Sequence, residues 1–195
     1  MTDRELLILD YLSNVRASTT KQIQDIFFIG LHHSVSYRVL NGLVDSKLIN
    51  RKFYRIGNKN THVYYLDKAP GKRNIDHDLL ITEFYTQLIK NGYEIISFEK
   101  NPIVAGIIPD AEIWFKEKES DKIHSLFLEV QLSEHDCIKK YYNFSSKVKR
   151  DIPATLYIVS DKKINIQKLR DFEIILDDLE MKKIKETFKQ KIASR

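Results

Sequence analysis

The sequence of 195 residues contains one cysteine, Cys137. Disulfide frameworks and multi-cysteine zinc sites need several converging sulfur atoms, so a single thiol excludes both and favours a reducing, intracellular compartment. No catalytic His and acid signature accompanies Cys137, which we expect to be a small, buried or half-buried side chain. His32, His33 and His62 have no metal-ligand spacing with it.

Long apolar runs are also lacking, and none approaches the ~20 residues that a membrane-spanning helix needs. The first residues, MTDRELLILDYL, carry acidic side chains where a secretory signal would be basic. We therefore expect a cytoplasmic protein with no membrane partner. Hydrophobic residues make up 43% and charged residues 30% of the chain, which is typical of a globular fold. The length fits one medium domain or two small ones.

The net charge of +5 is unevenly distributed. Residues 1–75 contain 12 Lys and Arg against 6 Asp and Glu, a net charge of +6, whereas residues 76–195 contain 20 against 21, a net charge of −1. The whole basic excess therefore lies in the first part of the chain. This distribution predicts a front half that binds a polyanion, joined to a nearly neutral second half.

Residues 1–67 are predicted to form three short helices and a hairpin. Helical spacing of apolar residues predicts a helix over 4–13, and the Ser-Thr-Thr run at 18–20 offers N-caps for a second helix through about Phe27. Ser34 is the expected cap of a third helix. Two strand-like runs then follow around a turn-rich tetrapeptide; the strands are 52–56 and 62–66, and the turn is 57–60.

The third helix should be amphipathic, with two opposite arcs. Its apolar arc is formed by Val35, Val39, Leu40, Leu43 and Val44, and its polar arc by Ser34, Tyr37, Arg38, Asn41 and Asp45. The order of three helices and a hairpin, with the stretch SYRVLNGLVDSKLINRKFYRIGNKNTHVYYL, resembles the winged helix-turn-helix family. That resemblance implies a third helix in the DNA major groove and a hairpin, the wing, whose cations contact phosphates.

By this resemblance Arg38 and Asn41 are the expected base readers, with Tyr37 beside them. The expected phosphate contacts are Arg51, Lys52, Arg55 and Lys59. Two other interpretations stay open. The polar arc and the hairpin can be an ordinary solvated face, and some winged helices bind protein instead of double-stranded DNA.

Residues 68–75 contain a Pro, a Gly and three cations without apolar periodicity, and we expect a linker there. Residues 76–195 form the second predicted domain, in which a helix and three strands precede alternating strands and helices. This order predicts a mixed α/β sheet and, with the first domain, an α+β fold. The predicted elements are a helix at 76–91, strands at 93–98, 110–115 and 125–132, a helix at 134–149, a strand at 154–159, a helix near 165–171, a strand at 172–176 and a last helix from about Asp178.

Two carboxylates in the predicted strands carry the candidate chemistry, in the stretches GIIPDAEIWF and SLFLEVQLS. Alternation places Asp110 with Glu112 on one face of its strand, and Glu129 with Gln131 on one face of the other. A Glu in a hydrophobic strand needs a cation, a metal or a hydrogen-bond donor, because an unpaired buried carboxylate is very costly. Two such acids on neighbouring strands offer hard oxygen ligands for magnesium.

The order helix, strand, Pro-Asp, strand, Glu-x-Gln and helix resembles the PD-(D/E)xK nuclease superfamily, which has the restriction-endonuclease-like fold. The resemblance implies that Asp110 and Glu129 bind Mg²⁺ or Mn²⁺, with Gln131 where the family usually has a Lys that positions or activates water. Gln131 cannot carry a positive charge, and Lys139 or Lys140 could supply the missing cation. Glu83, on the first helix of this domain, is the candidate for an additional acid of the site.

The resemblance narrows to the replication-relaxation family, which includes MOBC-type plasmid relaxases and accessory proteins of mobile elements. It rests on the His-x-Leu start of IDHDLLITEFYTQL, then PDA, LEVQ and IKKYYNF. It adds His77 to the candidate site; alone, His77 would be a helix-start cap or a solvated residue. Family members usually carry an acid where this chain has Gln131, which leaves both an active and a non-catalytic protein open.

Two functions therefore follow as expectations. One is a DNA-binding protein of a mobile element that nicks DNA with a divalent metal. The other is a non-catalytic DNA-binding regulator, or a replication or mobilisation accessory protein, whose second domain forms a homodimer or recruits a partner protein. Purely structural roles also stay open for the two acids: Asp110 as a turn residue at a strand end, and Glu129 paired with Lys139. For Tyr141 and Tyr142, a helix pair with one ring packed inward is favoured over a nucleophilic tyrosine.

Overall fold

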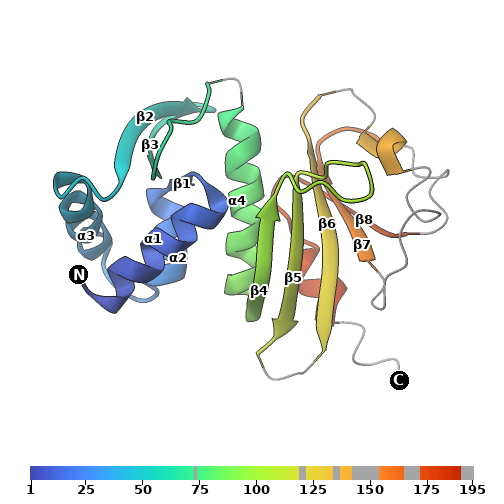
Figure 1. The fold of residues 1–195 in the computed structure, drawn as a ribbon, viewed down its shortest axis with the longest axis horizontal. Helices are drawn as coiled ribbons and strands as arrows, with labels where there is room; N and C mark the ends of the chain where they lie inside the picture. The colour runs from blue at the N-terminus through green and yellow to red at the C-terminus, as the bar shows by residue number, and fades with distance from the viewer. Residues whose placement is uncertain (73, 119–121, 134–136, 142–153, 165–171, 190–195) are drawn as a thin grey trace. The chain divides into compact units, whose positions relative to one another are not determined.

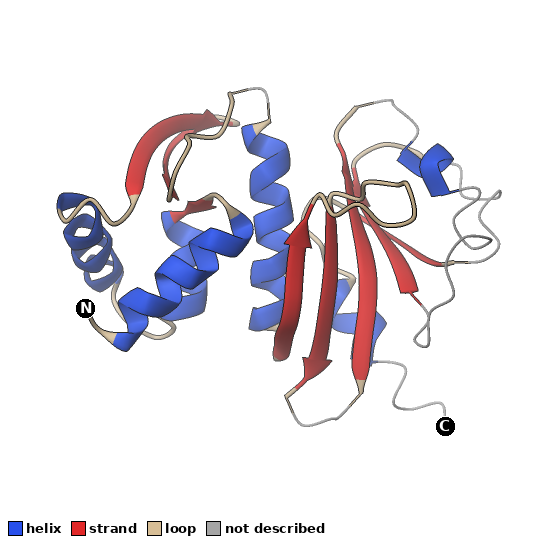
Figure 2. Cartoon of the chain, viewed as in Figure 1, coloured by secondary structure: helices blue, strands red, loops and turns tan. Residues whose placement is uncertain are grey.

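The computed structural model describes residues 1–72, 74–118, 122–133, 137–141, 154–164 and 172–189 (Figure 1). The chain divides into two compact units, Met1–Thr86 and Gln87–Arg195. Helices predominate in the first unit and strands in the second (Figure 2), and the fold is α+β with a mixed five-stranded sheet in the second unit. Within the described ranges, no helix has the length and apolar character to cross a membrane.

The first unit contains three helices, a small antiparallel sheet and most of a fourth helix. Its elements are α1 (Asp3–Val15), β1 (Ser18–Thr19), α2 (Thr20–Phe27), α3 (His33–Asp45), β2 (Asn50–Ile56), β3 (Lys59–Tyr65) and α4 (Ile75–Lys90), the last crossing into the second unit. The sheet has the order β1-β3-β2. The predicted helices and hairpin are confirmed, while the two-residue strand β1 was not predicted because it is too short to show alternation.

Helix starts in this unit follow side-chain capping. Thr19, in the predicted Ser-Thr-Thr run, is the N-cap of α2 and forms a capping box with Gln22. For α3 the predicted cap, Ser34, is wrong. The cap is His32, whose Nδ1 accepts a hydrogen bond from the Ser34 backbone N–H at 3.3 Å, so the helix begins two residues earlier, at His33.

The hairpin turn is tighter than predicted. Ile56 pairs with Lys59, so the loop is Gly57 and Asn58 rather than the whole tetrapeptide 57–60. Gly57 has a φ of 56°, and a positive φ at the first loop position is what a type II′ hairpin turn requires. The glycine therefore fixes the register of β2 against β3.

Helix α3 is amphipathic as predicted. Leu40 and Leu43 of the apolar arc are buried, and every member of the polar arc is exposed. Tyr54 and Val63, from β2 and β3, enter a core cluster with Ala17, Ile75 and Leu79.

Most of α4 belongs to the first unit, which explains why the units divide at Thr86–Gln87 and not at the expected linker, 68–75. The Thr82 hydroxyl donates to the Ala17 carbonyl at 2.8 Å, and the Gln22 amide donates to the Leu79 carbonyl at 3.0 Å. These bonds and the apolar contacts of Ile75 and Leu79 fasten the start of α4 to the helices before it.

The second unit is built on one sheet with the order β4-β5-β6-β7-β8. Its strands are β4 (Tyr93–Lys100), β5 (Ala111–Glu117), β6 (Ile123–Gln131), β7 (Ala154–Ser160) and β8 (Glu173–Asp177). The first three are antiparallel neighbours, and β7 and β8 run parallel to β6. The predicted mixed sheet is confirmed.

The helices of this unit differ more from the prediction. Of the expected helix 134–149 the structure describes only Cys137–Tyr141, a short 3-10 helix, η1. The expected helix at 165–171 lies outside the described residues. The last helix, α5, spans Ile184–Lys189 and begins later than Asp178, because residues 178–183 form turns.

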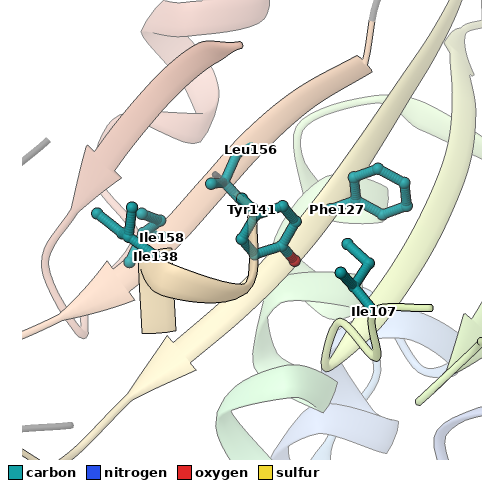
Figure 3. Close-up of a cluster of buried hydrophobic side chains, with 6 residues drawn as sticks. All are labelled: Ile107, Phe127, Ile138, Tyr141, Leu156 and Ile158. Carbon is teal, nitrogen blue, oxygen red and sulfur yellow. The ribbon is translucent and has the colours of Figure 1, made fainter. Parts of the chain in front are cut away.

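One core cluster of the second unit lies between η1 and the sheet (Figure 3). It contains Ile107, Phe127, Ile138, Tyr141, Leu156 and Ile158, and the half-buried Cys137 packs against it. Tyr141 is the buried ring predicted for the Tyr pair, and its partner Tyr142 lies outside the described residues.

Candidate functional site

The polar arc of α3 meets the hairpin in the first unit. Tyr37, Arg38 and Asn41 are exposed, and the Arg51 guanidinium donates a hydrogen bond to Asn41 Oδ1 at 2.6 Å. A residue expected to read bases and one expected to contact phosphates therefore form one connected surface. The bond uses one of the five N–H donors of Arg51 and leaves both amide hydrogens of Asn41 available to a further acceptor.

Strand alternation divides the four hairpin cations between two faces. Arg51 and Arg55 share a face with Phe53, whereas Lys52 shares the opposite face with Tyr54, which enters the core cluster on that side. We call the exposed set Tyr37, Arg38, Asn41, Arg51 and Arg55 the cationic face. Lys52 and Lys59 are exposed but alternate to the other side of the ladder.

An open groove of about 510 Å³ lies beside the cationic face, between α2, α3 and the hairpin. Its walls include four aromatic rings, His33, Tyr37, Phe53 and His62. Sequence reasoning missed Phe53 and His62 as functional candidates. The available signal was a large apolar residue in a predicted strand with an arginine two residues away on either side.

In the second unit, Asp110 directly precedes β5 and lies opposite Glu129 of the neighbouring strand β6. The ladder pairs Ala111 with Leu128, and one step earlier the Asp110 N–H donates to the Leu128 carbonyl at 3.1 Å. The Asp110 carboxylate accepts a hydrogen bond from the Val130 N–H at 2.7 Å. Alternation and pairing thus bring the two predicted acids together, 19 positions apart in the sequence.

Glu129 is 3% exposed and carries two partners from η1. The Lys140 ammonium lies 2.7 Å from Glu129 Oε1, and the Tyr141 hydroxyl donates a hydrogen bond to the same oxygen. Lys140 also donates to the Ile108 carbonyl at 2.7 Å. We call Asp110, Glu129, Lys140 and Tyr141 the acid cluster.

The pKa of Glu129 is raised to about 7, first by burial and then by the neighbouring Asp110 charge, against the opposing effects of Lys140 and Tyr141. The pKa of the Tyr141 hydroxyl is also raised, by burial and then by the charge of Glu129. The cluster therefore changes its protonation near neutral pH at Glu129, while Tyr141 stays a hydrogen-bond donor.

Of the two lysines predicted to supply the cation, Lys140 forms the ion pair with Glu129, whereas Lys139 is exposed. The suggested structural pair between Glu129 and Lys139 is therefore wrong. Gln131 does not replace the missing cation either. Its amide donates to the Ser133 carbonyl at 3.1 Å and its oxygen accepts from the Cys137 N–H at 3.4 Å, so its side chain links the end of β6 to the first residue of η1.

Glu83 and His77 lie on the part of α4 that belongs to the first unit. The Gln22 amide donates to Glu83 Oε2 at 3.0 Å, so this carboxylate is used in fastening α4 to α2. His77 is half-buried in the first turn of α4. The structure thus places these two candidates in the first unit and Asp110 and Glu129 in the second.

The chemistry of the acid cluster fits a hard divalent cation. Magnesium is bound in proteins by one or two carboxylates and completes its shell with waters and substrate phosphates, and the like-charged pair Asp110 and Glu129 supplies two such ligands. In the described part of the chain, no group of three or more His, Cys, Asp or Glu side chains converges as a metal site. A metal bound at the acid cluster would be held by these two acids, in competition with Lys140 for Glu129.

Comparison with known proteins adds no assignment. No protein-family model matches the chain, and no curated protein is similar to it in sequence.

Proposed function

We propose that this protein binds double-stranded DNA through the cationic face of its first unit. The observation that carries the proposal is the hydrogen bond between Arg51 and Asn41, which joins the exposed polar arc of α3 to the hairpin. A single exposed surface then offers Asn and Arg side chains for base edges and further arginines for phosphates.

The element order supports the winged-helix interpretation. Three helices are followed by a two-stranded hairpin, and the short strand β1, between α1 and α2, pairs with β3 to close a small sheet. In such an arrangement α3 is the helix for the major groove and the β2–β3 hairpin is the wing. The basic excess of residues 1–75 agrees with a polyanionic partner.

The test is duplex binding by the full chain. A pool of random-sequence duplexes is enriched on the protein, and the enriched sequence serves as a fluorescence-anisotropy probe over a range of salt concentrations. We expect affinity that falls steeply with salt, and a loss of about 100-fold in the double variant Arg38→Ala, Asn41→Ala, because each base contact contributes ~1–3 kcal/mol. Lys182→Ala, which removes one exposed cation from the second unit, is the matched control. Salt-independent or absent duplex binding would contradict the proposal.

A second candidate function is metal-dependent nicking of the bound DNA, as implied by the resemblance to PD-(D/E)xK nucleases and relaxases. It is favoured by the position of Asp110, directly before β5, opposite Glu129 of β6, with the Lys140 ammonium paired to the buried Glu129. A bound Mg²⁺ or Mn²⁺ would stabilise the charge that develops on the phosphate. Asp110 and Glu129 would hold it, Tyr141 would orient Glu129, and Lys140 would donate to a phosphate oxygen or to the attacking water.

Nicking is tested on supercoiled plasmid with magnesium or manganese. We expect open circles from the wild type and at least a 100-fold slower reaction from Asp110→Ala, with Asp161→Ala as the exposed-acid control in the same unit. If wild type and Asp110→Ala give the same background, the protein is the non-catalytic alternative, a DNA-binding regulator or accessory protein. Duplex binding that survives loss of both acids would agree with that outcome.

A further inference from the structure

The groove beside the cationic face has a lining that the duplex contacts do not explain. Phe53 is 64% exposed, although it lies in a strand between two arginines of the same face. His62, its cross-strand partner on β3, covers one side of the ring, with the ring centroids 3.9 Å apart. An exposed Phe ring does not gain the free energy that burial of its large apolar surface would give. This suggests that a ligand covers the side of the ring that His62 does not.

The opposite wall of the groove is aromatic as well. Tyr37 is 39% exposed and its ring meets His33 edge to face, with centroids 6.2 Å apart. Thr20, Asn60 and Thr61 add hydrogen-bonding groups to the lining. Rings at the walls with polar groups around them suit a flat, heteroaromatic ligand.

The charges around the groove select the kind of ligand. Arg51 and Arg55 flank Phe53 at two-residue spacing, and Lys21 lines the groove. None of the described residues that line it is acidic. Partial burial and the Arg51 guanidinium lower the pKa of His62, so this ring is neutral at pH 7 and adds stacking surface without charge. Cations beside an aromatic stack are the features with which proteins bind the backbone and base of an unpaired nucleotide.

We infer that the groove between α2, α3 and the β2–β3 hairpin binds an unpaired nucleobase, stacked on Phe53, next to the duplex held by the cationic face. The inference deepens the proposed function and rests on it for the duplex part. If the groove binds such a base, the preferred DNA is a duplex that contains an unpaired or extruded base. An unpaired base leaves the base stack at a low cost in free energy.

The test compares three probes on the full chain by fluorescence anisotropy. They are a 20-base-pair duplex, the same duplex with one unpaired adenine, and the single strand that carries this adenine. Placing 2-aminopurine at the unpaired position reports stacking directly, because its fluorescence is quenched by an aromatic neighbour. We expect the wild type to bind the bulged duplex about tenfold more tightly than the perfect one, with quenching.

Variants at Phe53 separate stacking from simple bulk. Phe53→Ala and Phe53→Leu should abolish the tenfold preference and the quenching, and change affinity for the perfect duplex less than twofold. Phe53→Trp should keep both. Because Phe53 is mostly exposed, these variants are expected to fold, which circular dichroism verifies. Ile96→Ala, an exposed apolar side chain of the second unit, is the control.

The outcomes distinguish this inference from the proposed function. Equal wild-type affinity for the perfect and bulged duplexes, or 2-aminopurine that is not quenched, would overturn the groove inference and leave duplex binding intact. Binding of the single strand that depends on Phe53, without binding of either duplex, would support the groove and contradict duplex binding. Absence of binding to all three probes would overturn both.

Discussion

The cationic face and the acid cluster both combine charged residues of a strand with side chains of a helix, yet their surroundings are opposite. Arg38, Asn41 and Arg51 are exposed, and Arg51 donates a hydrogen bond to Asn41 at the surface. Glu129 is buried and holds Lys140 and Tyr141 around one oxygen. Exposed charges cost little and remain available to a partner, whereas a buried charge must be satisfied within the fold. The cationic face is therefore available to bind a partner. The acid cluster contributes to the stability of the fold, and that contribution depends on pH.

The largest expected effect tests that coupling to pH. Folded Glu129 keeps its proton up to about pH 7, whereas an unfolded Glu releases it near pH 4.5. This group therefore stabilises the fold fully below pH 4.5, and its contribution falls by about 3 kcal/mol as the pH rises to 7. Glu129→Gln should remove this slope. Urea denaturation of both proteins between pH 4.5 and 8 measures it, and parallel curves would show that Glu129 titrates as an exposed acid does.

Removal of the cation should have the next largest effect. Lys140→Met leaves the Glu129 charge buried without its ion pair, and we expect a loss of about 2 kcal/mol of unfolding free energy at pH 8. At pH 5.5 the loss should shrink, because Glu129 is then protonated. Lys139→Met, at the exposed neighbouring lysine, is the control and should cost less than about 0.5 kcal/mol. Equal losses of unfolding free energy in the two variants would show that Lys140 is not the ion-pair partner of Glu129.

Substitutions in the cationic face are expected to change the affinity for DNA and not the stability of the fold. Arg55→Ala should weaken duplex binding several-fold and lower the slope of log affinity against log salt by about 1, as for one lost phosphate contact. Lys52→Ala removes the same charge from the opposite face of the hairpin and should change the slope by less than half as much. Identical effects of the two variants would mean that overall charge, not the face, decides binding.

The smallest expected effect concerns Glu83. Glu83→Ala removes the hydrogen bond from Gln22 and should lower the unfolding free energy by about 1 kcal/mol. Because Glu83 acts in the packing of α4, duplex binding and any plasmid nicking should be unchanged. A nicking rate that falls together with that of Asp110→Ala would return Glu83 to the active site.

Sequence patterns predicted the parts of the fold that depend on local periodicity. The apolar arc of α3, the hairpin and the three antiparallel strands follow from 3.6-residue and two-residue repeats. Alternation predicted the face on which Glu129 lies, whereas the pairing of β5 with β6 sets Asp110 opposite it. The boundary of the first unit did not follow, because hydrogen bonds from Thr82 to Ala17 and from Gln22 to Leu79 join residues far apart in the chain.

The sequence by itself determined where the basic excess lies, that disulfide frameworks and multi-cysteine zinc sites are excluded, and which residues share a strand or helix face. Only the tertiary structure decided which of two adjacent lysines meets Glu129, because one step along η1 turns a side chain from the surface to the sheet. It also decided that Arg51 joins Asn41 and that Phe53 borders a groove with Tyr37. Such contacts depend on how separate elements pack, which no local repeat encodes.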